Sequence, residues 1–147
     1  MEKLDIVVAS VHSHFTLSEA EMTKRIIRAI ENRFVHIIGH PTGRLLGERP
    51  MYPLDLDAVI HAAVEHNTVL EINGSPHRLD LDPRIVQNAK AAGVRLAVNT
   101  DAHGTRQLAH RRYGVEAARR GWLTKADVIN TWTLAALREE YGIGRRN

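Results

Sequence analysis

Short apolar segments recur along the chain about every 30 residues, and each is followed by a helical pattern. Strand–helix–strand connections of this length imply a parallel sheet with right-handed crossovers. The sequence therefore predicts an α/β fold of about four βα units, either a small open sheet or part of a (β/α) barrel. The predicted strands have the near-continuous apolar composition of buried strands and cover residues 5–11, 34–38, 68–72 and 94–98.

Residues that cap helix ends indicate where the helices begin. Ser18 followed by Glu21 has the pattern of a capping box, and Asp55 is a typical N-cap residue. Trp122 and Trp132 fall at helical spacing among apolar neighbours, so we expect both to pack in the core. The predicted helices cover residues 19–31, 56–66, 83–92, 105–120, 125–131 and 133–141, with an irregular loop over residues 41–53.

The composition is that of an ordinary globular domain, with 147 residues of which 44% are hydrophobic and 25% charged. No apolar run reaches the length of a membrane span, so we expect no membrane partner. The absence of cysteine excludes disulfides and thiolate metal sites, and it fits a reducing, cytoplasmic location. The pI of about 9.6 and the late cluster of arginines favour a polyanionic partner.

Ligand-type side chains stand where three of the predicted strands end. His12 follows the first strand, His40 follows the second, and Asp101 and His103 follow the fourth. Taken singly, each has a plainer explanation, since a strand-end histidine is commonly a hydrogen-bonded structural residue and an aspartate there can cap the next helix. Because parallel strands end at the same edge of a sheet, we expect all four to share one face. Imidazole and carboxylate ligands together suit manganese, zinc or iron.

Three further residues are placed to bind a phosphate beside these ligands. Asn73 ends the third strand, Arg78 follows it, and Arg44 lies in the loop after His40. A guanidinium matches a phosphate with two parallel hydrogen bonds. We therefore predict that Arg44, Arg78 and Asn73 bind substrate, and that the arginines stabilise charge that develops on the phosphate.

Four segments resemble the later motifs of the PHP (polymerase and histidinol phosphatase) domain: Ser10–Ser13, Gly39–Gly47, Leu70–Asn73 and Asn99–His103. The Gly39–Gly47 segment and Arg112–Trp122 resemble more specifically the PHP domain at the C-terminus of bacterial family X DNA polymerases. The likeness extends over nearly the whole chain. It implies the C-terminal part of a distorted seven-stranded (β/α) barrel, with a trinuclear metal centre at the carboxyl ends of its strands.

The resemblance also implies an activity, which is metal-dependent phosphoester hydrolysis. In family X polymerases this is a manganese-dependent 3′–5′ exonuclease activity with related processing of DNA 3′ ends. By this resemblance His12 and His40 would hold one metal, Asp101 a second and His103 a third. Asp101, His103 and Arg78 are then the predicted catalytic residues, manganese the expected ion with zinc or iron as alternatives, and DNA 3′ ends the partner of the parent protein.

The chain also departs from the family pattern. It lacks the early His-x-His motif, two further histidines and a bridging glutamate, and Glu71 lies within a strand rather than at its end. The polymerase domains are absent as well. We therefore interpret residues 1–147 as one partial PHP domain that is weak or inactive alone. Because the inner face and both edges of its sheet would be exposed, we expect the chain to associate with itself or with the missing part, or else to be marginally stable. The alternatives are a non-catalytic structural or DNA-binding remnant and a small-molecule phosphatase of the histidinol-phosphatase type.

Overall fold

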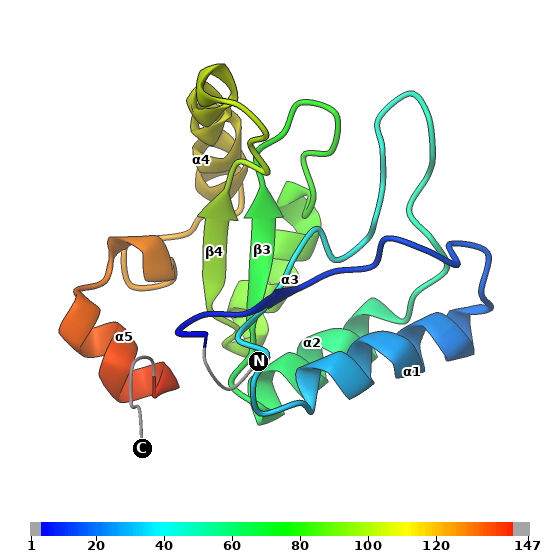
Figure 1. The fold of residues 1–147 in the computed structure, drawn as a ribbon, viewed down its shortest axis with the longest axis horizontal. Helices are drawn as coiled ribbons and strands as arrows, with labels where there is room; N and C mark the ends of the chain where they lie inside the picture. Colours follow the sequence, from blue (N-terminus) through cyan, green and yellow to red (C-terminus); the bar gives the residue numbers. More distant parts are fainter. Residues whose placement is uncertain (1–3, 143–147) are drawn as a thin grey trace.

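The computed structural model describes residues 4–142, so residues 1–3 and 143–147 of the predicted domain lie outside the described part. Four parallel strands form one sheet in the order β1-β2-β3-β4 (Figure 1). A doubly wound sheet reverses its strand order at a switch point, whereas sequential order is typical of the wall of a barrel. The predicted α/β class with about four parallel βα units is confirmed. The strands are β1 (Val8–Ala9), β2 (Ile37–Ile38), β3 (Val69–Asn73) and β4 (Leu96–Asn99).

Two helices begin at the predicted caps. The Ser18 side chain accepts a hydrogen bond from the Glu21 backbone in a complete capping box, and the Asp55 carboxylate accepts one from Ala58. The predicted helix over residues 105–120 is divided into a 3₁₀ segment and an α-helix. The helical elements are α1 (Glu19–Ile30), α2 (Leu56–Glu65), α3 (Pro83–Ala92), η1 (Thr105–His110), α4 (Arg111–Arg120), η2 (Ile129–Thr131) and α5 (Leu134–Tyr141).

The prediction of a helix over residues 125–131 is wrong, because this segment covers the outer edge of β4 instead. The backbone N–H of Leu96 donates to the carbonyl of Asp127, at 2.9 Å. The side-chain amide of Asn130 accepts from the N–H of Val98 at 2.7 Å and donates to its carbonyl at 3.1 Å. Only η2, at the end of the segment, is helical. The expectation that both sheet edges are exposed is therefore wrong for the β4 edge.

Apolar side chains cover both faces of the sheet. The larger cluster joins the sheet to α1, α2, α3 and α4, whereas α5 lies on the other side of the sheet (Figure 1). On the α5 side of the sheet, Trp132 packs against the smaller apolar cluster and stacks on Tyr141, with ring centroids 6.3 Å apart. This agrees with the prediction that Trp132 packs in the core. The sheet residues of the smaller cluster are Ile37, Val69 and Ala97.

Trp122, by contrast, is 75% exposed, and the prediction that it packs in the core is wrong. The preceding residue, Gly121, is buried against Val86 instead. Only glycine fits this position, because a Cβ atom there would lie 2.2 Å from a methyl carbon of Val86. The chain then turns through a left-handed conformation at Trp122, with φ of 58°, which leaves the indole outside.

β1 is the terminal strand at the other end of the sheet. Three apolar residues in and before this strand are exposed: Leu4 (62%), Ile6 (44%) and Val8 (49%). No helix in residues 4–142 is both long enough and apolar enough to cross a membrane.

Candidate metal and phosphate site

The parallel register brings the carboxyl ends of the strands to one edge, toward which the arrows of β3 and β4 point in Figure 1. His12, His40 and Asp101 each follow a strand at this edge. His40 and Asp101 also have positive φ angles, of 31° and 54°. Side chains other than glycine seldom adopt this conformation, and it costs free energy that the surrounding contacts must supply. Two of the predicted ligands thus have strained backbone conformations at this edge.

The structure brings the rings of His12 and His40 together. Their centroids lie 5.0 Å apart, with the rings edge to face. His12 Nε2 shares a hydrogen bond with Ser10 Oγ at 2.8 Å. His40 is 4% exposed, and its Nδ1 has no hydrogen-bond partner among the described residues. A buried ring nitrogen without a partner is unusual, and it fits a position for a metal ion.

The environment of His40 favours the neutral imidazole. Burial lowers its pKa to about 4, and the positive charge of Arg78 and the ring of His12 act in the same direction. The carboxylate of Asp101 acts in the opposite direction but does not outweigh them. Only a neutral imidazole can ligate a metal, so His40 is in the binding form at neutral pH.

Arg78 and Asp101, whose charges both act on His40, form an ion pair with Nε and Oδ2 3.1 Å apart. The Nη1 atom of Arg78 is buried and has no partner among the described residues. A guanidinium held through one nitrogen, with other donors unused, can bind an anionic oxygen. His103 is exposed and turns back onto its own loop, where its Nδ1 lies 2.8 Å from the carbonyl of Asp101.

The other two predicted substrate-binding residues have their polar ends engaged within the protein. Arg44 donates from Nε to the carbonyl of Arg78 at 2.9 Å, and from Nη2 to the carbonyl of Leu79. Asn73 donates to Glu71 at 3.1 Å and accepts from the N–H of Ser75 at 3.0 Å. In this arrangement Arg44 holds the backbone of the loop that carries Arg78, and Asn73 holds the end of β3.

Glu71 is a site residue that the sequence reasoning set aside. It is 5% exposed, and its Oε2 accepts a hydrogen bond from the backbone N–H of His40 at 2.6 Å. The side-chain amides of Asn73 and Asn99 donate to the same carboxylate at 3.1 and 2.8 Å. A charged residue within an apolar strand, two positions before the strand-end Asn73, was the sequence signal for this network.

Asp80 is a second residue that the sequence did not reveal. It is fully buried, and its Oδ2 accepts from the backbone N–H groups of Thr42 and Gly43, both at 3.0 Å. Burial raises the pKa of this carboxyl to about 6, although the hydrogen bonds from Thr42 act against this. Asp80 thereby fixes the turn that directly follows His40.

Within residues 4–142, the structure gathers no three histidine, aspartate or glutamate side chains in a group that could hold a metal ion. It places His12 beside His40 and pairs Asp101 with Arg78, while the exposed ring of His103 is hydrogen-bonded to the carbonyl of Asp101. The predicted ligands thus share one edge of the sheet, but they do not form a complete coordination shell by themselves.

Known proteins resemble this chain closely. The DNA polymerase/3′–5′ exonuclease PolX of Bacillus subtilis is 44% identical over 134 residues, which is 91% of this chain and 24% of that protein. A probable phosphatase of Caldanaerobacter subterraneus is 42% identical over 112 residues, or 70% of this chain and 42% of that protein. Another, of Thermoanaerobacter sp. strain X514, is 36% identical over 143 residues, or 89% of this chain and 55% of that protein. The resemblance to a bacterial family X DNA polymerase is confirmed.

No family model matches the chain. The chain spans about a quarter of the family X polymerase and about half of each phosphatase.

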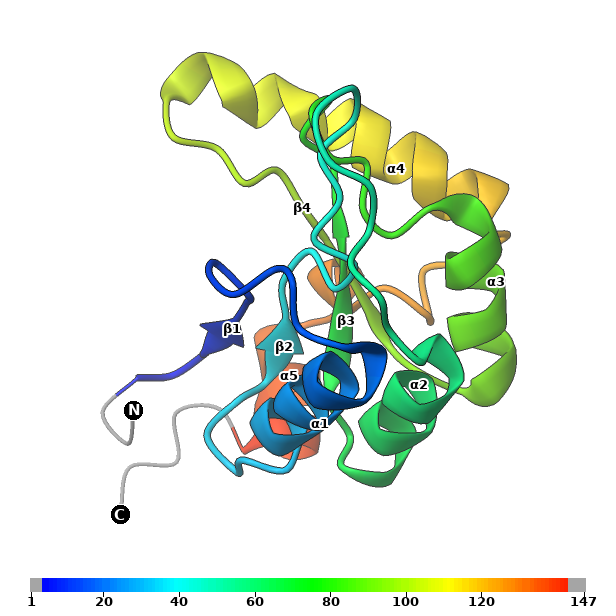
Figure 2. The same ribbon diagram turned by 90° about the vertical axis from the view of Figure 1, so that its right-hand side faces the viewer.

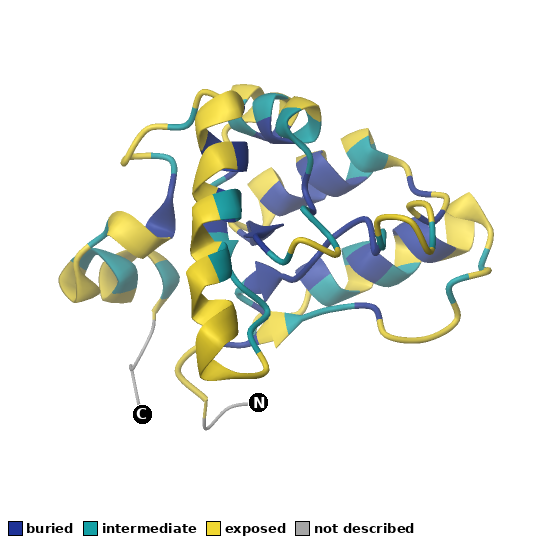
Figure 3. Cartoon of the chain, turned by 90° about the horizontal axis from the view of Figure 1, so that it is seen from above, coloured by how far each residue is buried: buried dark blue, intermediate teal, exposed yellow. Residues whose placement is uncertain are grey.

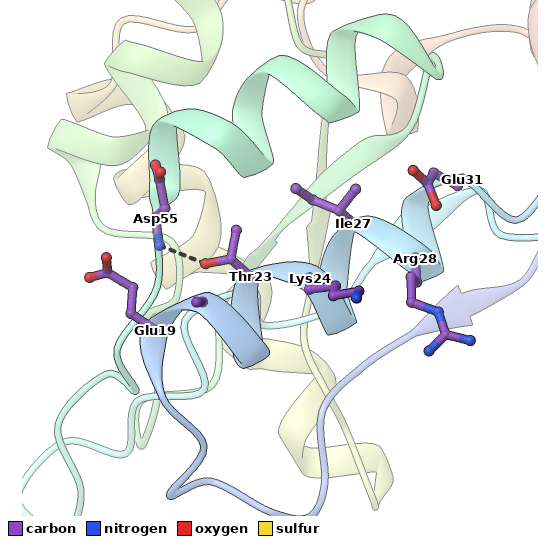
Figure 4. Close-up of a pocket in the computed structure, with 8 residues that line it drawn as sticks. Glu19, Thr23, Lys24, Ile27, Arg28, Glu31 and Asp55 are labelled. Carbon is purple, nitrogen blue, oxygen red and sulfur yellow. Dashed lines mark hydrogen bonds between the residues drawn. The ribbon is translucent and has the colours of Figure 1, made fainter.

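A surface groove of about 440 Å³ lies elsewhere, between α1 and the N-cap of α2 (Figure 4). Thr23 bridges the two elements by accepting a hydrogen bond from the N–H of Asp55 at 3.0 Å. The groove mixes acidic and basic side chains, such as Glu19 and Lys24, and none of the predicted site residues lines it. The groove is therefore a junction between helices and not part of the candidate site.

Proposed function

We propose that this chain supplies part of a metal-dependent phosphoesterase site that acts at DNA 3′ ends. The supporting observation is that the neighbouring imidazoles of His12 and His40 lie at the same edge of the sheet as the Arg78–Asp101 pair, whose charges act on His40. One relative is named a polymerase and 3′–5′ exonuclease, and others are named probable phosphatases. Phosphoester hydrolysis is the chemistry common to the exonuclease and phosphatase names.

The proposed cofactor is a divalent ion, manganese first, with zinc or iron as alternatives. When bound, such an ion turns water into a nucleophile near neutral pH and offsets the charge of the phosphate. His12 and His40 would be the ligands of one ion, with Asp101 and His103 as ligands of others. Burial keeps His40 neutral and therefore able to bind, and the Glu71 network keeps its backbone in place.

Arg78 has the role of binding the phosphate in this proposal. Its buried Nη1 is an unused donor, and Asp101 fixes the orientation of the guanidinium through Nε. A positive group held in advance near the phosphate stabilises charge that develops on its oxygens during hydrolysis. Arg44 acts through Arg78, because it holds the carbonyls of residues 78 and 79. Arg44 is therefore a positioning residue.

A second candidate is a non-catalytic remnant that binds metal or DNA without turnover. The observation in its favour is that no three ligand-type side chains gather within residues 4–142. A metal held by one or two protein ligands binds weakly, and it does not align hydroxide with phosphate. The two candidates agree on metal binding by His12 and His40 and differ in turnover.

Manganese binding and hydrolysis, measured separately, test both candidates. Binding is followed by the loss of the electron paramagnetic resonance signal of free Mn²⁺, in the unchanged chain and in the His12→Gln and His40→Gln variants. His61→Gln is the matched control, since His61 is exposed on α2. We expect both site variants to weaken Mn²⁺ binding and the control to leave it unchanged. Equal binding by all four proteins would overturn the proposed site.

Hydrolysis is assayed with manganese on a 3′-labelled recessed DNA and, separately, on p-nitrophenyl phosphate. If the unchanged chain slowly releases the 3′ nucleotide and the His40→Gln variant does not, the phosphoesterase candidate is supported. Metal binding with no hydrolysis of either substrate supports the remnant. Hydrolysis of the small ester alone would favour a small-molecule phosphatase and would overturn the assignment to DNA ends.

A further inference from the structure

Five exposed arginines lie along η1 and α4, directly after the candidate site. Helix α4 buries Gly114, Ala117 and Ala118 against the sheet and α3, and Gly114 approaches so closely that a Cβ atom there would lie 2.7 Å from a methyl carbon of Val98. This close packing sends the long side chains of the helix outward. We call the exposed side the arginine face, and its cations are Arg106, Arg111, Arg112, Arg119 and Arg120.

The arginine face has almost no compensating negative charge. Between Thr105 and Arg120 the sequence holds a single acidic residue, Glu116. Within residues 4–142, none of the five arginines takes part in an ion pair that the structure contains. Arg112 donates to the hydroxyl of its neighbour Tyr113 at 2.6 Å and keeps its charge. A row of guanidinium groups without ion-pair partners on one side of a helix attracts a polyanion.

Trp122 stands at the far end of the arginine face, and its exposed position is fixed by several contacts. Its φ of 58° is rare for a bulky residue and costs free energy. The structure holds it there, since the N–H of Trp122 donates to the carbonyl of Arg119 at 3.0 Å and Lys90 Nζ donates to the carbonyl of Trp122. Lys90 is itself paired with Asp127 at 3.4 Å. An indole that is 75% exposed on a fixed backbone is a suitable platform for stacking.

The position and length of this surface suit a nucleic-acid strand. Only Gly104 separates His103 from η1, and η1 continues into α4 across the top of the molecule (Figure 2). Seen from above, the helix nearest the viewer is coloured as exposed along most of its length (Figure 3). Helix α4 alone is about 15 Å long, at 1.5 Å per residue, which equals about four nucleotides at the roughly 3.4 Å rise of a stacked strand.

We propose that the arginine face and Trp122 bind single-stranded nucleic acid. The arginines contact consecutive phosphates, Trp122 stacks on a base, and the strand leads to the edge that carries His12, His40 and Asp101. The delivery of a 3′ end rests on the proposed function, whereas strand binding does not require it. An anionic membrane is the competing polyanion, but arginines separate the exposed Leu108, Val115 and Trp122, so no continuous apolar stripe is available for insertion.

Tryptophan fluorescence tests the proposal on the whole chain, in EDTA, so that metal binding and turnover play no part. The chain has two tryptophans, Trp122 and Trp132. We expect a short oligothymidylate to quench the fluorescence of the unchanged chain and of Trp132→Phe. The same oligonucleotide should leave the fluorescence of Trp122→Phe unchanged.

Charge variants test the phosphate contacts by fluorescence anisotropy of a labelled oligothymidylate. The double variant Arg111→Gln/Arg119→Gln should bind about tenfold more weakly, and the slope of log K against log salt should fall by about 1.4, or 0.7 for each lost contact. Lys24→Gln/Arg28→Gln is the matched control, because it removes the same charge from exposed positions on α1. Circular dichroism melting confirms that each variant is folded.

If both double variants lose the same affinity for the oligothymidylate, the proposal is overturned, since the effect would then come from net charge alone. Tighter binding to phosphatidylserine vesicles or to duplex DNA than to the single strand would also overturn it. If strand binding behaves as expected while the His12 and His40 variants leave manganese binding unchanged, the proposed function fails and the strand-binding surface stands.

Discussion

The carboxylate of Glu71 accepts a hydrogen bond from the backbone N–H of His40, with Oε2 and N 2.6 Å apart. His40 has a positive φ angle, so its backbone would relax without a partner at this position. Two asparagine amides, from Asn73 and Asn99, donate to the same carboxylate. Glu71 therefore links the ends of β2, β3 and β4 at the edge where the predicted metal ligands lie.

Glu71→Gln should destabilise the chain by about 1–3 kcal/mol. The amide nitrogen of glutamine is a donor, and it would replace a carboxylate oxygen that accepts hydrogen bonds. At least one of the buried donors on His40, Asn73 and Asn99 would therefore lose its acceptor. The measurement is urea unfolding followed by circular dichroism. Glu65→Gln, at an exposed position of α2, is the control and should change the free energy of unfolding by less than about 0.5 kcal/mol. Equal stability of the two variants would show that the Glu71 contacts contribute nothing net.

The pKa of His40 should respond to its two charged neighbours in opposite directions. In the unchanged chain we expect its ring to titrate at about pH 4. Arg78→Gln removes a cation that lowers this pKa, so the pKa should rise, and Asp101→Asn removes an anion that raises it, so the pKa should fall. The measurement is the chemical shift of the His40 ring proton as a function of pH. Shifts in the same direction in both variants would contradict the arrangement.

The low pKa of His40 also makes the free energy of unfolding depend on pH. The unfolded chain takes up a proton at His40 near the ordinary histidine pKa of 6.5, whereas the folded chain does so only near pH 4. The unfolded state therefore binds more protons between these values, and His40 lowers the free energy of unfolding as the pH falls through this range. His40→Gln should remove this contribution, which unfolding experiments at pH 6.5 and 4.5 can detect.

The features that followed from local rules could be predicted from the sequence. The capping box at Ser18 and the parallel strands require only nearby residues and periodicity, and both agree with the structure. The adjacency of His12 and His40 follows as well, because parallel strands end at one edge. These predictions needed no knowledge of packing between distant segments.

The features that depend on distant partners could not be predicted. The segment over residues 125–131 follows Thr124, a typical N-cap residue, but its backbone pairs with β4, which no local pattern reveals. Glu71 and Asp80 accept hydrogen bonds from backbone donors that lie 31 and 38 positions away in sequence. Trp122 has helical spacing, but the tight contact of Gly121 with Val86 turns it outward.

Gly43 should be far less tolerant of alanine than Gly47. Both have positive φ angles, of 62° and 79°, so both substitutions carry a backbone cost of about 1 kcal/mol. At Gly43, however, a Cβ atom would lie 2.1 Å from the ring of Tyr52, whereas at Gly47 nothing lies within 4 Å. Gly43→Ala should therefore cost about 1–3 kcal/mol more than Gly47→Ala.

Urea unfolding of the two glycine variants gives this difference directly, because the shared backbone cost cancels. The displaced Tyr52 would also lose its hydrogen bond to the carbonyl of Pro41, which is 2.6 Å long and lies next to His40. Gly43→Ala should therefore weaken Mn²⁺ binding as well, and Gly47→Ala should not. Equal unfolding free energies would mean that Tyr52 moves aside without cost.

The open edge of β1 should make the chain associate with itself. The segment over residues 127–130 covers the β4 edge, so strand pairing between copies is left to the β1 side. Exposed Ile6 and Val8 add apolar surface there, and a bare apolar edge promotes pairing between sheets. Val8→Lys places a charge on this edge and should shift the chain toward monomer, as sedimentation equilibrium over a range of concentrations will show.

Val64→Lys is the matched control for this change. Val64 is 44% exposed, close to the 49% of Val8, but it lies on α2, away from both sheet edges. A lysine at either position changes the net charge and the exposed apolar area to a similar degree, so only an effect that depends on the edge will separate the two variants. Association that falls equally in both would reflect general repulsion between charged molecules. Association that falls only in Val8→Lys would identify β1 as the edge through which copies of the chain pair.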